Sequence, residues 1–155
     1  MTLTDAPVVH LQRTVPASPN LVYRAWLEPA RIRQWLAPGS LEVTRAEVDE
    51  QVGGRYRIWQ GNADGEQGGF ECEILELVPD RRIVFSWGFV GPDREALSTF
   101  DSQLTITLDD APGGATTLTL VHEHLDALHE AMPEVAELVE TGWGMVFDKL
   151  IDATR

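Results

Sequence analysis

Two histidines near the end of a predicted strand are the first candidates for chemistry. His122 and His124 flank Glu123, and alternation along a strand places both imidazoles on the face of Leu118 and Leu120. Two imidazoles and a carboxylate could bind a divalent metal ion, but the spacing fixes no third ligand. We therefore predict no metal site and no cofactor. The alternatives are a strand end that enters solvent, or an imidazole that hydrogen-bonds a ligand at a cavity mouth.

Aromatic side chains recur at alternate positions of three predicted strands and on the last predicted helix. The sets are Ile83, Phe85, Trp87 and Phe89; Tyr56 and Ile58; Phe70, Cys72 and Ile74; and Trp143 and Phe147. If these faces point inward, they either fill the core or line a cavity for a flat, largely apolar ligand, with Met145 at its edge. The candidate ligand-binding residues are Tyr56, Phe85, Trp87, His122, Trp143 and Met145.

The carboxylates and the single cysteine form no catalytic pattern. Glu71 and Glu73 alternate with Phe70, Cys72 and Ile74, so we expect both carboxylates to face solvent. They also oppose thiolate formation at Cys72, which we expect to be a buried thiol. The sequence contains no nucleophile elbow, P-loop or dinucleotide fingerprint. We predict no catalytic residue, and a binding protein is favoured over an enzyme.

A long amphipathic helix over Pro133–Ala153 is expected to organise the chain. Its apolar arc consists of Val135, Leu138, Val139, Gly142, Trp143, Val146, Phe147 and Leu150. Gly142 and Gly144 lie in the middle of this helix, where each costs roughly 1 kcal/mol relative to Ala. They either allow a close approach of the backbone or leave room for something bulky.

The rest of the chain predicts two short helices and a series of strands. Ser18 is expected to cap a first helix that starts at Pro19, and Pro29 starts a second. The expected strands are Val8–Val15, Leu41–Val48, Arg55–Trp59, Phe70–Val78, Arg82–Phe89, Gln103–Leu108 and Thr116–His124. The expected loops are Gly61–Gly69, Gly91–Asp101 and Asp109–Ala115, with a linker at Leu125–Met132. Short connections between consecutive strands predict an antiparallel sheet and an α+β fold.

Composition excludes several classes of partner. The 155 residues favour a single domain over positions 1–155, and the net charge of −13 argues against binding to nucleic acid or to an anionic membrane surface. We find no signal peptide and no apolar run of membrane-spanning length. With one cysteine no internal disulfide forms, so the cytoplasm is the expected location.

The order of elements and several local phrases resemble one superfamily. The phrases are Val22–Trp35, Val52–Tyr56, Glu73–Trp87, Thr117–His122 and Gly142-Trp143 before Leu150. The chain resembles the helix-grip superfamily of Bet v 1-like or START-like domains, and within it the branch named for activators of the Hsp90 ATPase (AHSA1-like proteins). One departure is Trp35-Leu36, where the branch often has paired tryptophans. The resemblance implies a curved seven-stranded sheet wrapped around the C-terminal helix, with a cavity between them.

The resemblance implies three classes of function. The first is non-enzymatic binding of a small hydrophobic or aromatic molecule. Its most specific form is self-resistance to an enediyne, in which the toxin abstracts hydrogen from the backbone of Gly113 and the chain is cleaved. Pro112-Gly113-Gly114 is otherwise an ordinary hairpin turn. The alternatives are a co-chaperone domain that acts on an Hsp90-like ATPase, and a cyclase or hydrolase that uses His122 or His124.

Overall fold

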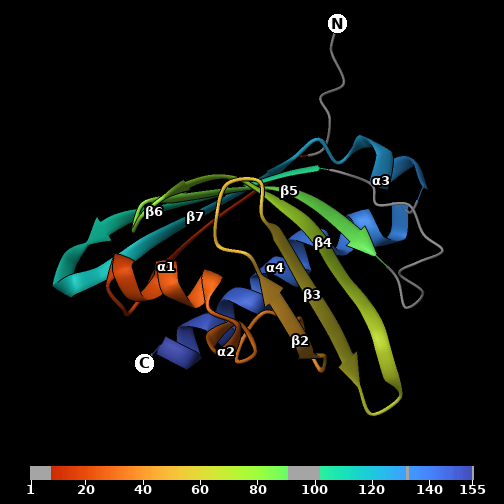
Figure 1. Ribbon diagram of the computed structural model, residues 1–155, viewed down its shortest axis with the longest axis horizontal. Coiled ribbons are helices and arrows are strands. Elements are labelled where there is room, and N and C mark those ends of the chain that lie inside the picture. Colours follow the sequence, from red (N-terminus) through yellow and green to blue (C-terminus); the bar gives the residue numbers. More distant parts are fainter. Residues whose placement is uncertain (1–7, 91–101, 132, 155) are drawn as a thin grey trace, which may run out of the picture.

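The computed structural model describes residues 8–90, 102–131 and 133–154. In this part of the chain, seven strands form one sheet and helices lie at its concave side and its ends (Figure 1). The elements are β1 (Val9–Val15), α1 (Pro19–Leu27), α2 (Pro29–Ile32), β2 (Glu42–Val48), β3 (Arg55–Asn62), β4 (Gly65–Val78), β5 (Arg82–Val90), β6 (Ser102–Ala111), the 3₁₀ turn η1 (Pro112–Gly114), β7 (Ala115–Glu123), α3 (Asp126–Ala131) and α4 (Pro133–Thr154).

All neighbouring strands in the sheet are antiparallel. The order is β1-β7-β6-β5-β4-β3-β2, so β1 pairs with β7 and every other neighbour is consecutive in the chain. The sheet curves around α4, which crosses its concave face (Figure 1). This arrangement confirms the predicted α+β helix-grip fold with a seven-stranded antiparallel sheet.

The first helix begins as its sequence predicts. The Ser18 hydroxyl accepts a hydrogen bond from the backbone N–H of Leu21 at 3.2 Å, and Pro19 occupies the first turn, where its missing N–H has no partner to lose. Pro29 then starts α2, whose Ile32 is buried. These two helices cover one end of the concave face.

The predicted loop over Gly61–Gly69 is wrong. β3 continues to Asn62 and β4 begins at Gly65, so only a tight turn separates them, and Asn62 Oδ1 accepts the N–H of Asp64 at 2.9 Å. Gly68 and Gly69 keep the ladder with φ of 123° and 149°, which a residue with a Cβ rarely adopts. The glycines that indicated a loop therefore belong to the β3–β4 hairpin.

The predicted linker Leu125–Met132 contains the short helix α3, which begins with Asp126, an acidic residue suited to a helix N-terminus. The predicted loop Gly91–Asp101 lies outside the described residues. No helix in the described ranges has the length and hydrophobicity of a membrane span.

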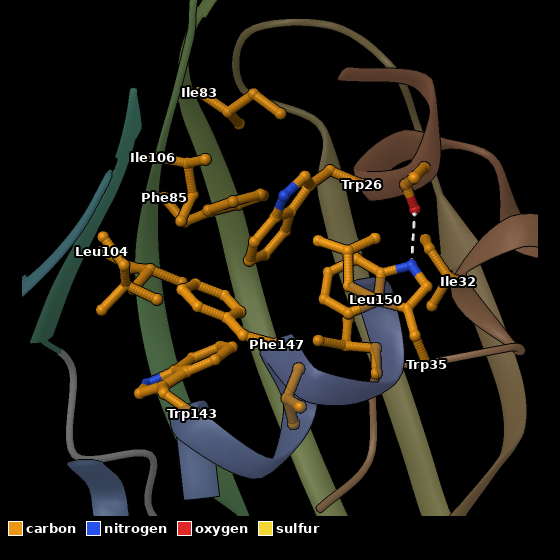
Figure 2. Packing of buried hydrophobic residues seen from close by; sticks show 14 of the residues in the cluster. Trp26, Ile32, Trp35, Ile83, Phe85, Leu104, Ile106, Trp143, Phe147 and Leu150 are labelled. Carbon is orange, nitrogen blue, oxygen red and sulfur yellow. Dashed lines mark hydrogen bonds between the residues drawn. The ribbon is translucent and has the colours of Figure 1, made fainter. Parts of the chain in front are cut away.

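Trp26 lies at the centre of the core, between α4 and the sheet (Figure 2). Its ring meets that of Trp35 edge-on at 4.7 Å and that of Phe147 edge-on at 6.4 Å. The Trp35 indole donates to the carbonyl of Ala25 at 3.1 Å, and the Tyr56 hydroxyl donates to the carbonyl of Trp26 at 2.6 Å. These two bonds satisfy buried carbonyl groups near the C-terminal end of α1.

Replacing Tyr56 by Phe should destabilise the protein, because the buried Trp26 carbonyl would lose its side-chain donor. We expect the free energy of unfolding to fall by about 1–3 kcal/mol in urea denaturation. Tyr23→Phe is the matched control, since no hydrogen bond involves the Tyr23 hydroxyl among the described residues. Equal losses in both variants would contradict the role assigned to the Tyr56 bond.

Candidate functional site

A cavity of about 260 Å³ lies between α4 and the sheet. Its walls come from β3, β4, β5, the first half of α4 and the segment that joins α2 to β2. The lining residues are Pro38, Leu41, Gln60, Gln67, Gly69, Phe70, Trp87, Phe89, Leu138, Val139, Gly142, Trp143 and Val146. Most of these side chains are apolar, so the cavity suits an apolar molecule of modest size.

Three aromatic rings form one wall of the cavity. The centroids of Phe70 and Trp87 are 4.9 Å apart, those of Phe70 and Trp143 are 5.9 Å apart, and those of the two tryptophans are 6.3 Å apart. The rings are tilted relative to one another by 36° to 56°. Such a wall offers extensive apolar contact to a flat ligand.

Gly142 helps to keep the cavity open. Among the described residues, a Cβ at this position would have one neighbour within 4 Å, the Pro38 side chain at 3.9 Å. Leu138, one turn earlier on α4, is 64% exposed. A Cβ at Gly144 would instead approach Arg13 on β1. Of the two uses predicted for these glycines, the structure favours leaving room at Gly142.

Two hydrogen bonds from Lys149 hold the part of the cavity wall that Pro38 and Leu41 form. Its Nζ donates to the carbonyl of Ala37 at 2.6 Å and to that of Leu41 at 3.0 Å, so α4 is joined to the segment that carries Pro38. Partial burial lowers the pKa of Lys149 from its ordinary value. These two bonds fix the distance between the helix and this wall of the cavity.

His122 lies behind the aromatic wall and is joined to it by a chain of hydrogen bonds. The Trp143 indole can only donate, so the 3.1 Å bond to His122 makes Nδ1 the acceptor. A neutral imidazole then carries its proton on Nε2, which donates to the Ser102 hydroxyl at 2.7 Å. Ser102 donates in turn to the carbonyl of Trp87 at 2.9 Å.

These hydrogen bonds and its burial make His122 unsuitable for acid–base chemistry. Its side chain is 0% exposed, and burial lowers its pKa to about 3, so it is neutral at pH 7. Because Nε2 holds the proton, His122 cannot accept the proton of Ser102, as a serine nucleophile requires. Both nitrogens are also engaged, so neither is free for a metal ion. His122 instead holds the Trp143 indole by a hydrogen bond and packs edge-on against the Trp87 ring, with centroids 4.6 Å apart.

Besides His122, which lies behind the wall, the predicted ligand-binding residues fall into three places. Trp87 and Trp143 line the cavity, whereas Tyr56 and Phe85 pack together in the filled core, with ring centroids 4.6 Å apart. The Met145 side chain is 44% exposed and does not line the cavity. The two alternatives for the aromatic set, filled core and cavity wall, therefore each hold for part of it.

Two predictions about neighbouring residues also have clear outcomes. Cys72 is buried, as expected. The prediction that His124 shares the face of His122 is wrong, because β7 ends at Glu123 and His124 turns away with φ of 62° and is exposed. Among the described residues, no group of three or more potential metal ligands occurs.

Gly113 is remote from the cavity. It lies in η1, at the tip of the β6–β7 hairpin, with φ of 77° (Figure 1). Ser102, which is bonded to the cavity wall, is at the other end of β6. This strand of 10 residues is roughly 30 Å long at about 3.3 Å per residue. The structure does not bring the predicted hydrogen donor and the cavity together.

Gln60 is a cavity residue that the sequence analysis missed. It follows Tyr56 and Ile58 at alternate positions of β3, and its side chain points inward and is only 6% exposed. Its Nε2 donates to the carbonyl of Leu36 at 2.9 Å. The alternation could have identified it, but the predicted strand ended at Trp59.

The comparisons with known proteins agree with this fold. The profile of the family described as Activator of Hsp90 ATPase homolog 1-like protein matches residues 16–154. A crystal structure from Chromobacterium violaceum has 31% identity and a TM-score of 0.72, with 95% of this chain and 96% of that chain covered. The AHSA1 protein from Silicibacter pomeroyi has 21% identity and a TM-score of 0.73, with coverage of 94% and 96%. No curated protein matches the sequence.

The neutral state of His122 should appear in the pH dependence of stability. Its folded pKa of about 3 lies below the unfolded value of about 6.5, so its contribution is complete above pH 6.5 and is lost as the pH falls toward 3. Over that range His122→Gln should reduce the slope of unfolding free energy against pH by up to about 1.4 kcal/mol per pH unit. The exposed His124→Gln is the control.

Nitrogen NMR of the imidazoles gives an independent check on the same residue. At pH 7 we expect His122 to show a protonated Nε2 and an unprotonated Nδ1, and His122→Gln assigns the signals by removing them. A protonated Nδ1, or an unchanged pH slope in His122→Gln, would contradict the hydrogen-bond chain.

Proposed function

The chain belongs to the family of Activator of Hsp90 ATPase homolog 1-like proteins, and from this premise we propose that it binds a small, flat, apolar molecule without transforming it. The family suggests a ligand-binding domain or a domain similar to an Hsp90 activator. The observation that carries the proposal is the aromatic-walled cavity of about 260 Å³ between α4 and the sheet.

The drive for binding is the removal of apolar surface from water. Phe70, Trp87 and Trp143 present ring surface to the cavity, and burial contributes roughly 25 cal/mol per Å² before the costs of association. The volume is slightly below the roughly 300–1,000 Å³ of pockets for drug-sized molecules. A compound of about two fused rings is therefore the expected ligand size.

The small number of polar side chains in the cavity supports binding rather than catalysis. Among the described lining residues, no side chain ionises, and the polar ones are Gln60 and Gln67. General acid–base catalysis needs a titratable group within reach of the substrate. His122, the candidate for a cyclase or hydrolase, is separated from the cavity by Trp143 and Trp87.

Enediyne sequestration is the most specific form of the ligand-binding hypothesis. The apolar, aromatic cavity is compatible with it, but the cavity does not contain Gly113. The function that we propose therefore includes binding and does not include backbone cleavage at that residue. A cytoplasmic location remains a prediction from the sequence.

An interaction with a chaperone is the second candidate function. The family match over residues 16–154 is the observation that favours it. Stimulation of an Hsp90-type ATPase by the purified protein, together with co-purification of the two, would support it. Such stimulation without binding of any aromatic probe would replace the ligand-binding proposal.

Gly142→Leu should abolish ligand binding, because its side chain would enter the cavity. Gly144→Leu is the matched control on the same helix, since position 144 faces Arg13 instead. Both changes remove a mid-helix glycine and improve helix propensity by a similar amount. We expect affinity for two-ring aromatic probes such as 2-naphthol to fall more than about tenfold only in Gly142→Leu.

Binding is measured by ligand-observed NMR titration, with quenching of tryptophan fluorescence by nitroaromatic compounds as a second readout. Equal binding by the two leucine variants would place the ligand elsewhere. An absence of saturable binding to the parent across a panel of two-ring compounds would overturn the proposed function.

A further inference from the structure

We propose that the cavity selects a neutral aromatic ligand with one hydrogen-bond donor, a hydroxyl or an N–H group, which it gives to Oε1 of Gln60. This inference rests on the proposed function and adds the chemical class of the ligand. It is carried by the orientation of the Gln60 amide, by its burial, and by the apolar character of the surrounding wall.

The orientation of the Gln60 amide follows from its partner. Nε2 lies 2.9 Å from the carbonyl oxygen of Leu36, and only the NH₂ end of an amide can donate to a carbonyl. The reverse orientation would bring two acceptor oxygens together. Oε1 is therefore the end of the amide that remains for another partner.

The Gln60 oxygen is an unused acceptor in a nearly buried side chain. The structure gives Oε1 no hydrogen bond from any described residue, although the side chain is only 6% exposed. Among the described residues, the polar side-chain atoms with neither solvent access nor a partner are the indole nitrogens of Trp26 and Trp87. Oε1 of Gln60 is not one of them, so this oxygen keeps some access to solvent. Gln60 lines the cavity, and Oε1 is the end of its amide that is not bonded to Leu36, so Oε1 is the acceptor that this side chain offers to a bound molecule.

The rest of the wall limits the ligand to one buried donor and no charge. The other polar side chain on the described lining, Gln67, is exposed at the rim, where its Nε2 lies 3.3 Å from the carbonyl of Gly65. No charged side chain among the described lining residues could pair with an ion, and burying an unpaired charge is strongly unfavourable. The described lining offers no further side-chain acceptor inside the cavity, so a second donor of the ligand would lack a side-chain partner there.

The experiment compares two probes of nearly equal shape on two proteins. 2-Naphthol carries a hydroxyl, and 2-methylnaphthalene carries a methyl group in its place. Their affinities for the parent and for Gln60→Leu are measured by ligand-observed NMR titration. We expect 2-naphthol to bind roughly 3- to 10-fold more weakly to Gln60→Leu, with no loss for 2-methylnaphthalene. Gln12→Leu, at an exposed glutamine of β1 that does not line the cavity, should leave both affinities unchanged.

The comparison separates this inference from the function on which it rests. The affinity for 2-methylnaphthalene reports whether Gln60→Leu still forms the cavity, even if losing the bond to Leu36 reduces stability. Equal weakening of both probes, or none, would overturn the role of Gln60 and leave the binding function in place. If neither probe binds to the parent, the proposed function itself fails.

Discussion

The hydrogen bond from the Trp143 indole to His122 joins the long helix to the sheet, and the arrangement of the site depends on it. Because an indole nitrogen only donates, this bond makes Nδ1 of His122 an acceptor and leaves the imidazole proton on Nε2. Nε2 then donates to the Ser102 hydroxyl, which donates to the carbonyl of Trp87. These neutral hydrogen bonds thus connect two residues of the aromatic wall that lie on different elements, Trp143 on α4 and Trp87 on β5. The same bonds give both ring nitrogens of His122 a partner. His122 is buried where a charged imidazole would be strongly unfavourable.

The filled core and the cavity occupy different parts of the space between α4 and the sheet. Trp26, Phe85 and Phe147 fill the space under the second half of α4 (Figure 2), where ring contacts and the bond from Tyr56 leave no role for a ligand. Toward the first half of the same helix, Gly142 contributes no side chain, and the facing segment is held by the two bonds of Lys149. The cavity therefore results from a missing side chain within a rigid frame.

Periodicity and capping predicted the helices, the strands and the α+β class, because those signals are local, whereas the curved sheet around the long helix was implied by the family resemblance. Ser18 and Pro19 mark a helix start, and the apolar arc of α4 repeats at helical spacing. The site was only partly predictable, since alternation shows which residues face inward but not where packing leaves space. Trp87 and Phe85 share one face of β5, yet one lines the cavity and the other does not. Gln60 was hidden by glycines that indicated a loop but belong to a hairpin.

The electrostatic character of the molecule gives a last constraint on the ligand. The net charge of −13 creates a field that disfavours anions near the protein, and the described cavity wall offers an anion no cation. A cation would be attracted to the surface, but entry would strip its hydration with no carboxylate on that wall to replace it. A neutral molecule is not repelled by this field and loses little hydration on entry, and it gains contact with three aromatic rings. The acidity of the chain thus acts in the same direction as the selectivity that we propose for the cavity from its apolar walls and from the buried acceptor of Gln60.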